Sequence, residues 1–120
     1  MSTSVRRRSI AAALAILVLN LAASIGAADE PTLTPQQQQG KRAYDHLCVY
    51  CHSPGVWGTN RLAKRVDKEH AVLESRTDLS TSAIQTIART GIGSMPPLRK
   101  SELSEADLSA IAAYLTRQNR

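Results

Sequence analysis

The clearest helical pattern lies near the end of the chain. Four apolar residues there recur at i, i+3, i+4 and i+7, the spacing of one helix face; they are Leu108, Ile111, Ala112 and Leu115. Ser104 is placed to cap the first turn, with Asp107 as the acidic member of a capping box. Leu103 can then pack against Leu108 as a hydrophobic staple. The pattern therefore predicts a helix that opens at Ser104.

Two more helices are predicted by their start signals. Thr34 is suited to cap a helix in which Pro35 is the first residue and Gln37 lies three positions after the cap. This helix leads directly into a cysteine motif. A second helix is predicted from about Ser80 to Thr90, with Gly91 as its C-terminal stop. Its apolar stripe is formed by Ile84, Ile87 and Ala88.

The middle of the chain is less regular. The stretch from Ser53 to Thr59 is rich in helix breakers and predicts a loop. A short helix is predicted around Asn60 to Leu73, with Leu62, Val66 and Leu73 directed inward. No segment alternates strongly enough to predict a strand. We therefore expect an all-α domain.

The N-terminus has the order of a secretory signal peptide: Arg6 to Arg8, the apolar run Ile10 to Leu19 and a tail of small residues. An uncleaved membrane anchor is the alternative, because about 20 apolar residues can span a bilayer. Export would place the domain in the periplasm. The expected organisation is a signal peptide over 1–28, a linker over 29–33 and one domain over 34–120.

Composition narrows the class of protein. Removing the three leader arginines from the 15 Lys and Arg leaves 12 against 10 Asp and Glu. A nucleic-acid-binding domain would be expected to keep a clustered basic face, whereas these cations are mixed with acids. Only 3% of the chain is aromatic, and it has no Phe. A domain of about 90 residues with so few large apolar side chains tends to need a staple such as a disulfide or a metal.

The two cysteines supply a candidate for that staple. Cys48, Cys51 and His52 form the C-x-x-C-H spacing of c-type haem attachment. Two thiols one helical turn apart can each add to a haem vinyl group, and the following histidine is then carried under the iron. Exported proteins occupy an oxidising compartment, where free thiols seldom persist without a covalent use.

Three other interpretations compete with haem. A thioredoxin-like dithiol would want a β-α-β pattern around the cysteine pair, and no strand-like run precedes Cys48. A structural zinc site needs four ligands, so His46 or His70 would have to join the two cysteines and His52. A plain disulfide would leave His52 unexplained.

Met95 is the candidate for the second axial ligand of a haem iron. It is the only methionine after the leader and lies in Gly91-Ile92-Gly93-Ser94-Met95-Pro96-Pro97, where glycines allow unusual turns and prolines stiffen the exit. Ligation by methionine and histidine closes both axial positions and raises the reduction potential. A buried gap-filling methionine is the alternative, with His70 as the fallback ligand.

An open iron site is the other functional class to consider. If Met95 does not bind, ligand sensing or peroxidase-like chemistry becomes accessible, and a distal base or arginine is then expected. Arg89 and His70 are the candidates for that role.

From Gly40 to Leu115 the chain resembles the class I c-type cytochromes. Gly40-x-x-x-Tyr44-x-x-x-Cys48 is similar to the first helix of that family, and Tyr114 matches the aromatic position of its last helix. The resemblance implies an all-α fold of three to five helices around one covalent haem c. It also implies attachment through Cys48 and Cys51, axial ligation by His52 and Met95, and one-electron transfer rather than enzymatic catalysis.

A narrower resemblance concerns the partner. The segment from Met95 to Leu115, with the upstream Arg76-Thr77-Asp78-Leu79, is similar to small cytochrome subunits of periplasmic dehydrogenases, such as p-cresol methylhydroxylase-type flavocytochromes. This implies a dehydrogenase as electron donor and a downstream cytochrome or oxidase as acceptor. No nucleic-acid partner is expected, and a membrane is expected only if the leader is uncleaved. Trp57, Arg61 and Arg65 are candidate partners for the haem propionates.

Overall fold

The structure is a computed structural model that describes residues 32–119. The chain divides into two compact units, Met1–Thr32 and Leu33–Arg120, and the described residues belong almost wholly to the second. The predicted signal peptide and residues 29–31 of the predicted linker lie outside the described residues.

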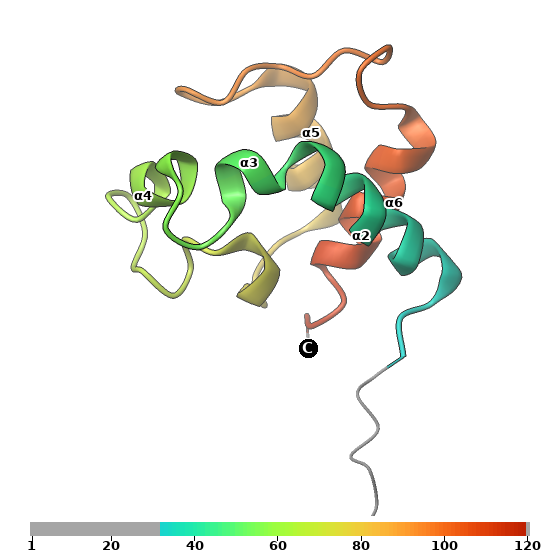
Figure 1. The fold of residues 1–120 in the computed structure, drawn as a ribbon, viewed down its shortest axis with the longest axis horizontal. Helices are drawn as coiled ribbons and strands as arrows, with labels where there is room; N and C mark the ends of the chain where they lie inside the picture. Colours follow the sequence, from blue (N-terminus) through green and yellow to red (C-terminus); the bar gives the residue numbers. More distant parts are fainter. Residues whose placement is uncertain (1–31, 120) are drawn as a thin grey trace, which may run out of the picture. The chain divides into compact units, whose positions relative to one another are not determined.

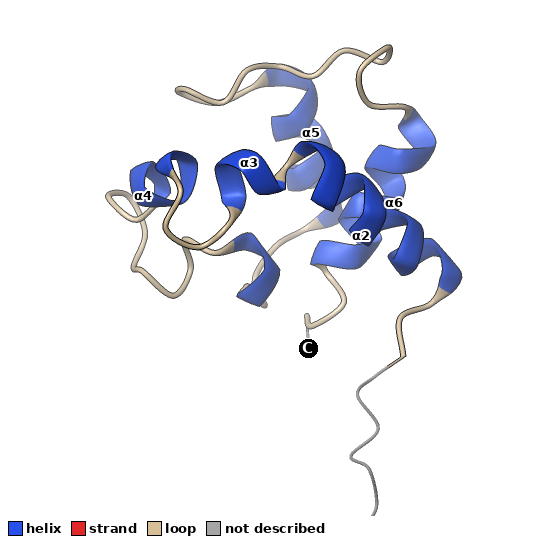
Figure 2. Ribbon diagram, in the orientation of Figure 1, coloured by secondary structure: helices blue, strands red, loops and turns tan. Residues whose placement is uncertain are grey.

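The described part of the chain consists of helices and loops (Figure 1; Figure 2). The elements are α2 (Pro35–Leu47), α3 (Val49–His52), α4 (Trp57–Leu62), the 3-10 helix η1 (Leu73–Ser75), α5 (Thr81–Thr90) and α6 (Glu105–Leu115). Between residues 32 and 119 no strand forms, and the one β-bridge joins Ile92 to Met95. The predicted all-α fold is confirmed. None of the described helices is both long enough and apolar enough to span a bilayer.

The cap predicted for α2 forms, and α5 begins and ends close to the predicted residues. The Thr34 hydroxyl accepts the Gln37 N–H at 3.2 Å, and the Gln37 side chain accepts the Thr34 N–H at 3.0 Å, which completes the capping box of α2. Ser80 caps α5 through the Ala83 N–H, and Gly91 ends that helix with a φ of 71°. These contacts satisfy backbone donors and acceptors that a helix end otherwise leaves unpaired.

The cap of α6 differs in one detail from the prediction. Ser104 accepts the Asp107 N–H at 3.0 Å, as expected, but its hydroxyl then donates to the Asp107 carboxylate at 2.8 Å. The carboxylate therefore pairs with the cap side chain rather than with the cap backbone. Leu103 and Leu108 are both buried in the same cluster, as a staple requires.

Helices α2 and α6 cross closely and form the main core (Figure 1). A Cβ on Gly40 would lie 1.9 Å from the Ala110 carbonyl oxygen, so only glycine permits this approach. Beside the crossing, the rings of Tyr44 and Tyr114 lie 6.0 Å apart, tilted by 56°. Tilted aromatic pairs at this distance add to the stability gained from burial.

Both bounds of the helix predicted around 60–73 are wrong. Helix α4 begins at Trp57 and ends at Leu62, so the predicted loop over 53–59 is shortened to 53–56. The Asp67 carboxylate accepts the His70 N–H at 2.9 Å. Such a side-chain bond offers the backbone an alternative to a helix, and turns occupy most of the path from Ala63 to η1.

Candidate functional site

The two cysteines lie one helical turn apart at the start of α3. The N–H groups of Cys51 and His52 both donate to the Cys48 carbonyl, at 3.1 and 2.9 Å. Both thiols are free, with Cys48 half-buried and Cys51 exposed. Burial, reinforced by the nearby Cys51, raises the pKa of Cys48 to about 11. The structure therefore presents a reduced thiol pair on one side of a short helix.

The imidazole of His52 follows directly on this pair. Its Nδ1 atom is buried and has no hydrogen-bond partner among the described residues. Burial lowers the pKa of His52, which favours the neutral ring. A neutral imidazole is the form that binds a metal. Histidine ligands usually donate the second ring nitrogen to a carbonyl, and the structure supplies no such acceptor within residues 32–119.

Helix α4 packs directly on the attachment motif. A Cβ on Gly58 would lie 2.2 Å from the Cys51 carbonyl oxygen, so this glycine allows the two short helices to touch. The buried Thr59 donates its hydroxyl to the Ser53 carbonyl at 2.7 Å. From the other side, the Tyr44 hydroxyl approaches the His52 carbonyl at 3.5 Å. Tyr44 belongs to the first-helix pattern on which the family resemblance rests, whereas no pattern in the sequence indicated Gly58 or Thr59.

Met95 lies at the end of a tight turn. The Ile92 N–H donates to the Met95 carbonyl at 3.1 Å, and the Met95 N–H donates back at 2.9 Å. Gly93 has a φ of 59°, while no other residue of the turn has a positive φ, a pattern that fits a type II′ turn. Gly91 has a φ of 71°, and a Cβ there would lie 2.6 Å from the Met95 carbonyl oxygen. The prediction that these glycines allow unusual turns is confirmed.

A second set of bonds closes the loop that carries Met95. The Leu98 N–H donates to the Ala88 carbonyl at 2.8 Å. The Arg89 guanidinium donates to the carbonyls of Leu98 and Leu103 at 3.0 and 2.9 Å, and lies 3.2 Å from the Glu105 carboxylate. One side chain thus ties α5 to both the exit of the loop and the start of α6. Arg89 was also a candidate distal group for an open iron site, a role that this engagement disfavours.

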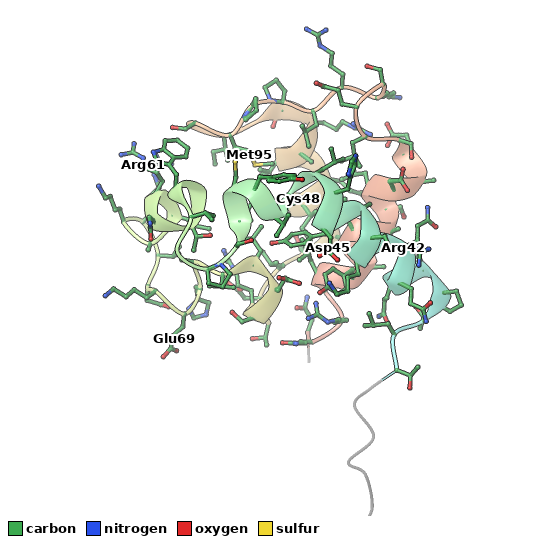
Figure 3. The ribbon with its side chains drawn as sticks, viewed as in Figure 1. Arg42, Asp45, Cys48, Arg61, Glu69 and Met95 are labelled. Atoms are coloured by element: carbon green, nitrogen blue, oxygen red, sulfur yellow. The ribbon has the colours of Figure 1, made fainter. Side chains whose placement is uncertain are left out.

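The thiols and His52 lie in a part of the unit with little core of its own. The buried hydrophobic residues of the described chain lie in other segments, and none comes from 45–70; they are Tyr44, Ala71, Ala88, Leu103, Leu108, Ala110, Ile111, Ala112, Tyr114 and Leu115. Met95 is half-buried, and Figure 3 labels it together with Cys48. The residues present therefore fit a flat apolar group, because they offer it two thiols for attachment and one nitrogen and one sulfur as ligands.

The competing metal site is not supported. Within residues 32–119, no group of three or more His, Cys, Asp and Glu side chains is placed to hold a metal ion. His46 is exposed on α2, and the His70 ring is paired with Asp67 at 2.7 Å. Neither histidine therefore joins the cysteines in a zinc site.

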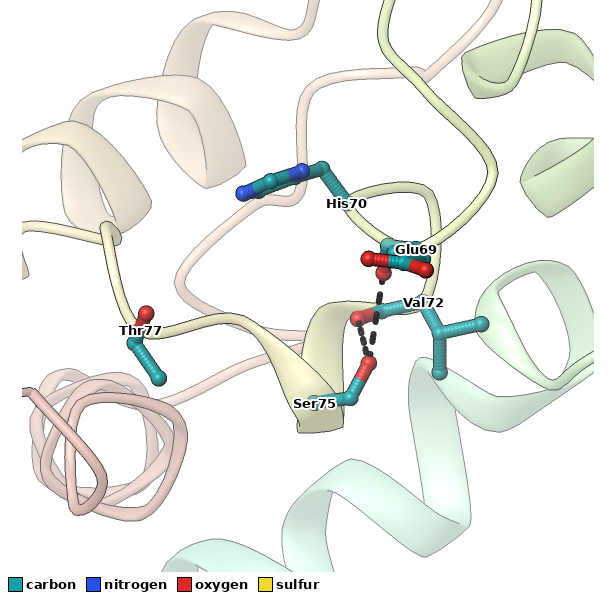
Figure 4. A pocket seen from close by; sticks show the side chains of 5 residues that line it. All are labelled: Glu69, His70, Val72, Ser75 and Thr77. Carbon is teal, nitrogen blue, oxygen red and sulfur yellow. Dashed lines mark hydrogen bonds between the residues drawn. The ribbon is translucent and has the colours of Figure 1, made fainter.

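An open pocket of about 530 Å³ lies elsewhere in the unit (Figure 4). It is lined by Glu69, His70, Val72, Ser75 and Thr77. The Ser75 hydroxyl is directed to the carbonyls of Val72 and Glu69, at 3.0 and 3.4 Å, and so is not presented as a nucleophile. This pocket contains none of the four residues predicted for the haem.

Comparison with known proteins agrees with the site. The family described as cytochrome c oxidase, cbb3-type, subunit III matches residues 35–115. The 4-cresol dehydrogenase [hydroxylating] cytochrome c subunit of Pseudomonas putida is 32% identical over 90 residues, which is 75% of this chain and 69% of that protein. No solved structure matches the chain. The chain therefore belongs to the class I cytochrome c family, whose members carry electrons on haem c rather than catalyse a reaction of their own.

Proposed function

We propose that the protein is a one-electron carrier whose haem is attached through Cys48 and Cys51 and whose iron is held by His52 and Met95. The observation that carries the proposal is the arrangement of Cys48, Cys51 and His52 along the single turn of helix α3. It joins two free thiols, one helical turn apart, to an imidazole whose buried Nδ1 has no partner in the described residues. That combination, in a chain of this family, is suited to covalent attachment and axial ligation together.

Each residue has a distinct task in this proposal. A bound haem supplies the one-electron iron couple. His52 stays neutral because its ring is desolvated, so its lone pair is available to a metal. Gly58 and Thr59 fix the backbone on both sides of His52. Met95 offers a thioether from a hydrogen-bonded turn, and a methionine ligand raises the reduction potential.

The proposed donor is a dehydrogenase, with a downstream cytochrome or oxidase as acceptor. The donor is supported by the likeness to the cytochrome c subunit of a 4-cresol dehydrogenase. Transfer is proposed to occur in the periplasm, because residues 1–28 have the order of a signal peptide.

The alternative functions find less support. A reactive thiol oxidoreductase needs a thiol with a lowered pKa, whereas burial raises the pKa of Cys48. A peroxidase-like site needs a free distal group, but Arg89 is engaged by two carbonyls and His70 by Asp67. An electron carrier needs neither a reactive thiol nor a free distal group, so it is compatible with these contacts of Arg89 and His70.

The test is whether haem stays on the chain after denaturation. Full-length protein is expressed with haem-attachment machinery, together with Cys48→Ala/Cys51→Ala and, as a control, Met95→Ala. We expect denatured wild type and Met95→Ala to retain haem, because neither loses a thiol, and the double cysteine variant to release any haem it holds. Wild type without covalent haem, or a double variant that keeps it, would contradict the proposal.

A further inference from the structure

Glu74 is an acid that the proposed function leaves unused, and its carboxylate lies against the aromatic core. It belongs to η1 and is half-buried, whereas most acids of the described residues are exposed. The carboxylate accepts a hydrogen bond from the hydroxyl of Tyr114, which is only 3% exposed. Burial, and then this bond, raise the pKa of Tyr114 to about 12, so the phenol remains a donor at neutral pH. A negative charge is therefore held at the edge of the core by a buried phenol.

A second core tyrosine brings the surroundings of this carboxylate to the proposed iron ligand. The rings of Tyr114 and Tyr44 lie 6.0 Å apart, and the Tyr44 hydroxyl approaches the His52 carbonyl at 3.5 Å. Burial raises the pKa of Tyr44, and the charge of Glu74 is the next largest cause of that rise. The charge of Glu74 is therefore felt at the hydroxyl that contacts the backbone of His52.

The cations nearest to this cluster are directed to other groups. The Arg117 guanidinium lies 4.1 Å from the centre of the Tyr114 ring and donates to the backbone carbonyls of Tyr114 and Glu74, at 2.8 and 3.3 Å. The Lys41 ammonium lies 6.0 Å from the same ring centre and pairs with Asp45 at 2.7 Å. Within residues 32–119, Glu74 forms no ion pair. Its charge is thus not cancelled at contact distance by the part of the chain that the structure describes.

A fixed negative charge near an iron site favours the oxidised iron. Reduction adds one electron and lowers the positive charge of the site by one, so a nearby anion makes reduction less favourable. The effective dielectric constant inside a protein is about 20 rather than the 80 of water, so a half-buried charge acts more strongly than an exposed one at the same distance. Salt also screens buried charges much less than exposed ones.

We propose that Glu74 tunes the reduction potential of the protein, lowering it against the rise that a methionine ligand confers. The proposal rests on the proposed function, since it requires an iron bound by His52. Met95 would act as a ligand, whereas Glu74 acts through the field of its charge and does not touch the iron. The electron comes from the proposed dehydrogenase donor, and no bond forms or breaks. Glu74 thus adjusts how readily the protein accepts that electron.

The test measures the reduction potential of the full holoprotein at pH 7, where carboxylates are ordinarily ionised. Glu74→Gln removes the charge and keeps an oxygen that can accept the Tyr114 hydroxyl. Glu69→Gln is the matched control, because Glu69 is an exposed acid of the same segment, which Figure 3 shows directed outward at the edge of the unit. Both variants change the net charge by the same amount.

We expect Glu74→Gln to shift the equilibrium toward the reduced protein by about 10-fold, which is a rise of about 59 mV for one electron. Glu69→Gln should shift it by less than about twofold, because an exposed charge is screened by water and salt. At about 1 M salt the effect of Glu74→Gln should remain, whereas any effect of Glu69→Gln should vanish. Equal shifts in the two variants, or no rise in Glu74→Gln, would overturn the proposal.

Tyr114→Phe separates the charge of Glu74 from its structural role. This variant removes the same hydrogen bond between η1 and α6 but leaves the carboxylate charged, so the potential should not rise. A rise in Tyr114→Phe equal to that in Glu74→Gln would show that the bond matters and the charge does not.

A double variant covers the case in which Glu74→Gln folds poorly. Glu74→Met/Tyr114→Phe replaces both partners of the hydrogen bond by apolar groups of similar shape, a change that can be nearly neutral for stability. It removes the same charge and should raise the potential as much as Glu74→Gln. A double variant with the wild-type potential would contradict the proposal.

Failure of the proposed function would look different. It would appear in the wild type itself, as haem lost on denaturation or a reduced spectrum that shifts under carbon monoxide. Failure of the present inference would leave the wild-type spectrum as expected, with Glu74→Gln at the wild-type potential.

Discussion

Met95 and His52 are held by the backbone around them rather than by hydrogen bonds to their own side chains. Met95 closes a turn through two backbone bonds to Ile92, and His52 lies in α3 between contacts from Tyr44 and Thr59. A thioether is only a weak hydrogen-bond acceptor, and the buried Nδ1 of His52 has no hydrogen-bond partner among the described residues. Both side chains are therefore free to act as ligands once the chain is folded.

Replacing Met95 with alanine should open one axial position. We expect the ferrous variant to take up carbon monoxide and its reduction potential to fall by a sizeable part of the roughly 0.8 V that axial ligands span. Met95→His is the control, because it supplies a different ligand and should still resist carbon monoxide. Spectroscopic titration measures both quantities. An alanine variant that still excludes carbon monoxide would show that another residue ligates the iron.

The Asp67–His70 pair should contribute stability over a limited pH range. The hydrogen bond to the Asp67 carboxylate raises the pKa of His70 above the ordinary 6.5. The His70 backbone N–H, and then its ring, lower the pKa of Asp67 below the ordinary 3.8. The histidine contribution is therefore present below pH 6.5 and lost as pH rises through the raised pKa. The carboxylate contribution is present above pH 3.8 and lost as pH falls through the lowered pKa.

His70→Gln should accordingly destabilise the protein at about pH 5.5 and have little effect at about pH 9. The effect should be small because the pair is exposed. Urea denaturation at the two pH values measures it, with His46→Gln as the control for an exposed histidine that forms no ion pair within the described residues. A destabilisation that is the same at both pH values would rule out the ion pair as its cause.

Among the helices, those that begin at a capping side chain could be predicted from the sequence, whereas the bounds of α4 could not. The caps at Thr34, Ser80 and Ser104 are short-range signals, and each marks the helix start seen in the structure. The start of α4 has no such side-chain cap, and Gly58 in its first turn lies against the Cys51 backbone. Glycine has a low helix propensity, so the sequence argues against a helix at Gly58. The close approach that favours glycine there is seen only in the three-dimensional structure.

The loop between α5 and α6 should depend on Arg89. Arg89→Ala leaves the carbonyls of Leu98 and Leu103 without their donor, which costs about 1–3 kcal/mol for groups that remain buried. Because Leu98 closes the loop of Met95, we expect faster binding of imidazole to the ferric iron, at a rate limited by release of Met95. Stopped-flow absorbance at saturating imidazole measures that rate.

Arg117→Ala is the matched control for Arg89. Arg117 also donates to two carbonyls, those of Tyr114 and Glu74, but at the other end of α6. It should lower the free energy of unfolding without accelerating imidazole binding. If both variants accelerate binding in proportion to their loss of stability, Arg89 has no specific role in holding the Met95 loop.

Across the whole molecule, the packed core and the site occupy different segments. The core is dominated by α6 with Tyr44, while residues 45–70 contribute no fully buried hydrophobic side chain. The family and the residues predicted to hold the haem came from short motifs in the sequence. The supporting contacts of Arg89 and Thr59 join residues that no local pattern relates, so they could not be predicted.

Folding of the whole unit should therefore depend on haem. Cys48→Ala/Cys51→Ala, or wild type made without haem-attachment machinery, should lose much of its helical circular dichroism, because a chain of this size without Phe buries too little apolar surface. The Met95→Ala holoprotein, which keeps both thiols, should stay helical. Native-like dichroism from haem-free protein would show that the protein core suffices.

The most direct measurement is the absorption spectrum of the purified wild-type protein, oxidised, reduced, and reduced under carbon monoxide. A one-electron carrier with His52 and Met95 on the iron should be low-spin in both states, show the weak far-red band of a methionine–iron(III) bond, and keep its reduced spectrum under carbon monoxide at neutral pH. A reduced spectrum that shifts promptly when carbon monoxide is added would show an open axial position and contradict the electron-carrier account.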